Sequence, residues 1–177
     1  MLRRALRKYA GLRHHVDQCL LGDDDGMWEA ELKKFLRRES CWAKGGEPNL
    51  RFDKRKDGWA LLDHAPRRIV SVSDIEVIPF LRDGERSIRG YDLIGRARYE
   101  FDAAYGQEDA EFLLEHQDEI PEECRSYFLV FPRSVWRDLS GHSSVPFLRW
   151  DGGRCLLDFG WLGHDWDSRD RLVRPRK

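Results

Sequence analysis

Residues 145–159 read VPFLRWDGGRCLLDF, the clearest local signal for regular structure in the chain. Two largely apolar runs, 145–150 and 154–159, flank Asp151-Gly152-Gly153. A short connection of this kind favours a tight turn, because glycine adopts positive φ angles at little steric cost. The stretch therefore predicts a β-hairpin in the C-terminal third of the chain.

Further strands are predicted upstream of the hairpin. Residues 127–131 read YFLVF, and this continuous apolar run indicates a strand that is buried on both faces. Shorter β-branched or apolar runs predict strands at 59–62, 69–72 and 75–78, with one or two more within 88–101. Asp83-Gly84 predicts a turn.

Apolar residues at helical spacing predict four helices, at 2–20, 27–38, 108–117 and, more briefly, 134–139. Residues 169–177 are charged and broken by Pro175, and are interpreted as a tail. With helices first and strands after, the pattern favours an α+β fold. In this predicted fold, N-terminal helices are followed by a mostly antiparallel sheet with one or two further helices and the C-terminal β-hairpin. A length of 177 residues predicts a single domain over 1–177.

Composition excludes few functions. Charged residues make up 36% of the chain, yet 31 basic and 32 acidic side chains leave a net charge of only −1. Global charge therefore favours no partner type. The four cysteines, at 19, 41, 124 and 155, form no C-x-x-C pair, and the N-terminus shows no secretory signal. We expect reduced thiols, no zinc, no cofactor, no membrane association and a cytoplasmic location.

Charge is concentrated locally in one acidic stretch, residues 100–124, which contains no Lys or Arg. Its ten carboxylates are Glu100, Asp102, Glu108, Asp109, Glu111, Glu115, Asp118, Glu119, Glu122 and Glu123. On the predicted helix, Phe112 and Leu113 would face the core. The acidic side chains would point outward, namely Glu108, Asp109, Glu111 and Glu115. The stretch is interpreted as a docking surface for a basic protein, as a mimic of nucleic acid, or else as a solvated helix and loop.

Aromatic residues of the C-terminal third are a second group of candidates for contacts to a partner. Trp161 and Trp166 lie among Gly and Asp residues, so we expect partial exposure and a contact role for them. Phe147 and Phe159 are predicted core residues. The leading hypothesis is a non-catalytic protein-binding module, of an inhibitor, immunity or adaptor type, using the acidic stretch and these Trp residues.

Two alternatives remain open. Residues 1–20 and 169–177 each carry five basic side chains against one acid, so Arg3, Arg4, Arg7, Arg174 and Arg176 are candidates for contacts to nucleic-acid phosphates. The favoured interpretation of these ends is a solvated helix face and a solvated tail, because no nucleic-acid-binding motif accompanies them.

The other alternative is a small hydrolase-type enzyme with a site near His142 and the cluster at 164–170, HDWDSRD. No nucleophile signature or phosphate-binding loop supports this hypothesis. The cluster lacks the spacing of a calcium loop, and an ordinary turn accounts for it, so no metal is expected.

Overall fold

The computed structural model describes residues 48–176. These residues form a seven-stranded sheet with the order β1-β5-β6-β4-β9-β2, in which β7 pairs with β6. A separate two-stranded sheet joins β3 and β8. The strands are β1 (Ala60–His64), β2 (Ile75–Ile78), β3 (Ser87–Arg89), β4 (Phe128–Val130), β5 (Ser134–Arg137), β6 (Ser143–Asp151), β7 (Arg154–Trp161), β8 (Asp165–Asp167) and β9 (Asp170–Pro175).

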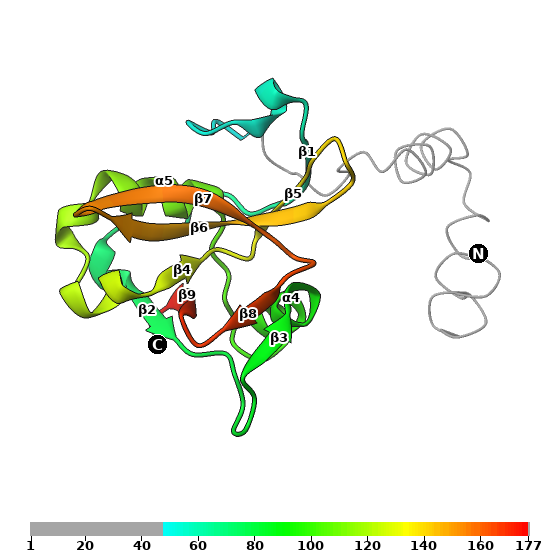
Figure 1. Cartoon of the computed structure of the whole chain (residues 1–177). Coiled ribbons are helices and arrows are strands. Elements are labelled where there is room, and N and C mark those ends of the chain that lie inside the picture. Colours follow the sequence, from blue (N-terminus) through cyan, green and yellow to red (C-terminus); the bar gives the residue numbers. More distant parts are fainter. Residues whose placement is uncertain (1–47, 177) are drawn as a thin grey trace, which may run out of the picture. The chain divides into compact units, whose positions relative to one another are not determined.

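Two α-helices and four 3₁₀ turns complete this part of the chain. Figure 1 shows α5 along the β6–β7 hairpin and α4 beside β3 and β8. The helical elements are η1 (Lys54–Asp57), η2 (Val72–Asp74), α4 (Gly90–Tyr99), α5 (Gln107–Glu115), η3 (Gln117–Glu119) and η4 (Glu122–Ser126).

Every strand pair is antiparallel except β4–β9. The predicted α+β class with a mostly antiparallel sheet is confirmed for these residues. The predicted helices at 2–20 and 27–38 lie outside them, so the single-domain prediction stays a prediction.

The hairpin prediction is confirmed. Strands β6 and β7 pair from Ser144↔Trp161 to Asp151↔Arg154, and only Gly152 and Gly153 lie between the strands. Their φ angles of 56° and 81° are both positive, as a type I′ turn requires. The twist of this turn matches that of the strands, so the local sequence is sufficient to set the register.

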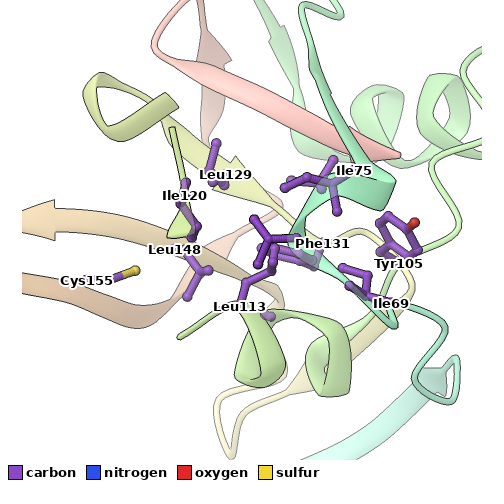
Figure 2. Packing of buried hydrophobic residues seen from close by; sticks show 12 residues of the cluster. Ile69, Ile75, Tyr105, Leu113, Ile120, Leu129, Phe131, Leu148 and Cys155 are labelled. Atoms are coloured by element: carbon purple, nitrogen blue, oxygen red, sulfur yellow. The ribbon is translucent and has the colours of Figure 1, made fainter. Parts of the chain in front are cut away.

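The core has two parts on opposite faces of the sheet. Leu129 of β4 packs in a cluster with Leu113 of α5, whereas its neighbour Val130 packs with Leu93 of α4. Successive strand residues point to opposite faces, which explains the continuous apolar run of β4. Figure 2 shows the first cluster gathered between α5 and the strands. Each helix therefore covers one face of the sheet.

The predicted tail at 169–177 is wrong, because residues 170–175 form β9. This strand lies between β4, to which it is parallel, and β2, to which it is antiparallel. Leu172 and Val173 are fully buried, one in each core cluster. Two apolar residues among arginines give little sequence signal, yet they suffice here because a core cluster covers each face of the strand.

Three other predicted elements differ from the structure. Residues 69–72 are not a strand, since Ser71 caps the turn η2 in a capping box with Asp74. Residues 134–139, predicted as a helix, contain β5 instead.

Within 88–101 the structure has the end of β3 and then helix α4 rather than further strands. At Gly90 a Cβ atom would lie 2.6 Å from both Leu162 Cα and Trp166 Nε1. Glycine at this position is thus required by close packing, not by a turn.

Candidate functional site

The middle of the acidic stretch, on α5, forms buried hydrogen bonds rather than a surface. Asp109 is fully buried. Its Oδ1 accepts the backbone N–H groups of Arg68 and Ile69, at 2.7 and 2.9 Å, and its Oδ2 accepts that of Gly106 at 2.9 Å. Burial raises the pKa of this carboxyl above its usual value, and the three N–H groups oppose that rise.

Glu111 and Glu108 serve neighbouring segments in the same way. Glu111 accepts the backbone N–H groups of Arg51 and Phe52, at 2.9 and 3.0 Å, and the Gln107 amide at 2.8 Å. Glu108 accepts the backbone N–H of Arg67 at 2.8 Å. These three carboxylates therefore hold chain segments that precede the helix by 40 to 60 residues.

The predicted outward orientation is wrong for Asp109 and Glu111. Segments 51–52 and 67–69 run along α5 and present unpaired N–H groups, which need acceptors when water is excluded. Glu115 is exposed as predicted and Glu108 is partly so. No sequence motif signals these contacts, because the donors are backbone groups.

A polar network, not predicted from the sequence, continues from α5 to the sheet. Gln107 accepts Trp136 Nε1–H at 2.7 Å, and its own N–H donates to Ser134 Oγ at 2.8 Å. His64 lies 3.3 Å from Ser134 Oγ and 3.3 Å from Glu108 Oε1. Serine, imidazole and carboxylate are the residue types of a nucleophile with its base and orienting acid.

This Ser134–His64–Glu108 arrangement is nonetheless closed to a substrate. Ser134 is fully buried, and its Oγ already accepts the Gln107 N–H. A Cβ at Gly106 would lie 2.7 Å from that oxygen, so backbone packs directly over it. What the three side chains do in this structure is join β1, β5 and α5.

The second half of the acidic stretch is exposed. We define the acidic edge as Asp118, Glu119, Glu122 and Glu123, on η3 and η4. Within residues 48–176 these four carboxylates have no ion-pair partner. The nearest arginine in sequence, Arg125, donates to the carbonyl oxygens of Ile120 and Asp118 instead. The acidic edge therefore presents concentrated negative charge to solvent.

A side-chain hydrogen bond and the buried side chain of Ile120 attach the acidic edge to the sheet. Gln117 Oε1 accepts the backbone N–H of Cys155 at 2.9 Å, which fixes η3 against the start of β7. Cys124 and Cys155 are free thiols. Burial raises the pKa of the Cys155 thiol to about 12, so it is protonated and unreactive at neutral pH.

Trp161, at the other end of β7, is a partly exposed aromatic residue with 37% of its surface accessible. Its ring contacts two imidazoles, with centroid distances of 4.6 Å to His142 and 4.5 Å to His164. A Cβ at Gly163 would be 2.5 Å from the Trp161 ring, so the ring packs directly against that backbone. The predicted exposure is confirmed for this tryptophan.

The predicted exposure of Trp166 is wrong, since only 5% of it is accessible. Its ring packs over Gly160, where a Cβ would be 2.4 Å away, and belongs to the cluster that contains Leu93. The neighbouring Gly and Asp residues predict partial exposure, but here Gly90 and Gly160 make room for the large ring. Phe147 and Phe159, predicted core residues, are each partly buried.

The acidic edge and Trp161 lie far apart. Cys155 adjoins the edge and is six positions from Trp161 on the same strand. A strand rises about 3.4 Å per residue, so the separation is roughly 20 Å. The acidic edge and Trp161, both assigned from the sequence to the binding module, thus lie near opposite ends of β7.

The predicted basic ends are only partly described. Arg3, Arg4 and Arg7 lie outside residues 48–176. Arg174 forms an ion pair with Glu76 at 2.8 Å, and Arg176 donates to the Ile75 carbonyl at 3.2 Å.

The cluster at 164–170 uses its carboxylates locally. Asp165 pairs with Arg89 at 3.3 Å, Asp167 pairs with Arg169 at 3.0 Å, and Asp170 accepts the Asp167 N–H at 2.8 Å. Among the described residues, no group of three or more His, Cys, Asp or Glu side chains is arranged to hold a metal ion.

Comparison with protein-family models, with curated proteins and with solved structures finds no match for this chain. No helix within residues 48–176 has both the length and the apolar character needed to span a bilayer.

Proposed function

We propose that this domain is a protein-binding module that docks a basic partner surface on its acidic edge. The observation that supports the proposal is the placement of Asp118, Glu119, Glu122 and Glu123, which are exposed and have no neutralising cation in the described part of the chain. Like charges held this close repel one another, and a basic partner would relieve that repulsion.

Rigid attachment of the acidic edge favours binding. The Gln117–Cys155 hydrogen bond holds η3 on β7, and Arg125 ties η4 to the carbonyl oxygens at 118 and 120. A fixed array of charges loses little conformational freedom on docking. It also steers a basic partner before contact, which raises the association rate more than it slows dissociation.

Trp161 is the proposed residue of a second contact. A half-exposed tryptophan is the side-chain type most enriched at binding hot spots. Because Trp161 lies roughly 20 Å along β7 from Cys155, which bonds to Gln117 beside the acidic edge, a partner would engage both only through an extended surface. The acidic edge therefore carries the proposal, and Trp161 is tested separately.

The test starts with capture of a basic protein from a lysate of the source organism, followed by association kinetics with the purified partner. We expect Glu119→Lys with Glu123→Lys to slow association about tenfold or more at low salt, because steering contributes 10- to 1,000-fold. The matched control reverses Asp83 and Asp92, two exposed carboxylates away from the acidic edge. Circular dichroism confirms that both variants fold.

The control variant should bind at the wild-type rate. An unchanged association rate for the edge-reversed variant would contradict the proposal, as would capture of the same proteins by both variants. Trp161→Ala is expected to speed dissociation if the partner spans β7. No effect of Trp161→Ala would confine the interface to the acidic edge.

A further inference from the structure

Three arginines from separate segments surround a hollow of about 200 Å³, which we call the arginine pocket. Arg68 follows β1, Arg98 is in the last turn of α4, and Arg133 lies between β4 and β5. The remaining lining residues are Asp102, Ala103 and Ala104. None belongs to the acidic edge, so this pocket is independent of the proposed function.

The backbone around the pocket is fixed from several directions. Arg68 N–H donates to buried Asp109 at 2.7 Å, and Arg133 N–H donates to the Tyr105 carbonyl at 3.1 Å. Ala103 N–H donates to the Ala97 carbonyl at 2.8 Å, which closes the end of α4. The positions from which the arginine side chains extend are therefore set before any ligand arrives.

The charges of the pocket are not balanced. Arg98 pairs with Asp63 at 2.6 Å. Neither the Arg68 nor the Arg133 guanidinium has a hydrogen-bond or ion-pair partner within residues 48–176, and nor does the Asp102 carboxylate. The three arginines are thus accompanied by two carboxylates, Asp102 in the lining and Asp63 in its pair with Arg98. The guanidinium donors of Arg68 and Arg133 have no acceptor among the described residues.

We propose that the arginine pocket binds the phosphate group of a phosphomonoester or free inorganic phosphate. A phosphomonoester presents three acceptor oxygens and a charge of about −1.5 to −2 at pH 7, which three guanidinium groups can share. Guanidinium groups suit this geometry because each offers a planar fork of donors. A hollow of about 200 Å³ is below the roughly 300–1,000 Å³ of typical ligand sites, so it fits a single anionic group.

Substitution of Asp102 tests whether the pocket binds an anion. Its carboxylate lines the pocket and opposes an anion there. Asp102 also has φ 54°, the left-handed region that Asn tolerates well, so Asp102→Asn should keep the fold. Removing this negative charge should strengthen phosphate binding, whereas a merely structural pocket would not respond in that direction.

The experiment is a titration of the full chain followed by NMR at the Ala103 and Ala104 amides, with affinity measured by calorimetry. The probes are inorganic phosphate, O-phosphoserine, dimethyl phosphate and acetate. We expect saturable shifts with the first two and at least tenfold weaker binding of the other two. Preference for O-phosphoserine over inorganic phosphate would identify an esterified ligand, and the reverse a free one.

Substitution then assigns the binding to the pocket. Arg68→Gln and Arg133→Gln should each weaken phosphate binding about tenfold or more, since a hydrogen bond to a charged group contributes roughly 1.5–3 kcal/mol. Arg86→Gln, at another exposed arginine, should leave it unchanged. Equal binding of dimethyl phosphate or acetate, unchanged affinity of both arginine variants, or no saturable shift with phosphate would overturn the proposal.

Discussion

The acidic stretch contains two groups of carboxylates that look alike in the sequence but differ in burial and in their hydrogen-bond partners. In α5, Asp109 and Glu111 are buried and accept backbone N–H groups of distant segments. A few residues later, Glu119 and Glu123 face solvent with no ion-pair partner in the described residues. The difference shows that burial and available donors, not local charge density, decide whether a carboxylate stabilises the fold or remains free for a partner.

The largest expected effect is from Asp109→Ala. Three backbone N–H groups lose their acceptor, and each buried donor left without one costs about 1–3 kcal/mol. We expect the free energy of unfolding in urea to fall by roughly 3–5 kcal/mol. Glu119→Ala is the matched control and should change it by less than about 0.5 kcal/mol. Similar losses in the two variants would end the distinction between the groups.

A smaller loss is expected from Glu111→Gln. The glutamine keeps one acceptor oxygen, but its amide N–H₂ would face one of the N–H donors that Glu111 now accepts. We expect a loss of about 1–3 kcal/mol in the free energy of unfolding. Hydrogen exchange should accelerate most at the Arg51 and Phe52 amides. Uniform acceleration across the domain would instead show that Glu111 does not hold this segment locally.

The buried group should also make the free energy of unfolding depend on pH. Because burial raises the pKa of Asp109 above 3.8, the folded state retains its proton at pH values where the unfolded state has lost it. The contribution of this side chain is therefore greatest below pH 3.8 and declines as the pH rises through the folded-state pKa. The stability advantage of wild type over Asp109→Asn should narrow over that window in urea unfolding. An advantage that widens as pH rises would mean that the hydrogen bonds outweigh burial.

The smallest expected effect on stability is at the acidic edge. Glu119→Lys with Glu123→Lys breaks no ion pair within residues 48–176 and reduces repulsion among the four carboxylates. We expect the free energy of unfolding to stay within about 0.5 kcal/mol of wild type, with any change toward greater stability. Thermal unfolding of the variant and of wild type at low and high salt measures this difference in stability. A marked loss at both salt concentrations would indicate that these side chains support the fold.

Sequence predicted those parts of the structure whose causes are local. The turn at Gly152-Gly153 sets the β6–β7 register, and the apolar run of β4 reflects cover on both faces. The strand β9 could not be predicted, because Leu172 and Val173 are the only fully apolar positions among charged neighbours. Its strand character depends on partners more than 40 residues away in β4 and farther still in β2.

The candidate sites were predictable to a similar degree. The excess of carboxylates is visible in the sequence, and exposure of Trp161 was correctly expected. The burial of Asp109 was not predictable, since its donors are backbone N–H groups about 40 residues upstream. The arginine pocket was missed for the same reason. Its three arginines stand 30 and 35 positions apart, and no motif relates them.

The place of β9 in the sheet has a consequence for synthesis on the ribosome. Within the described residues, β2 has β9 as its only strand partner, and Ile75 pairs with Pro175, 100 positions later. At translation rates of about 5–20 residues per second, β2 waits roughly 5–20 seconds for that partner to be made. During this interval the apolar side chains of Ile75 and Ile78 lack the strand that pairs with them in the finished sheet. The sheet around β2 is therefore completed only after translation has passed residue 175.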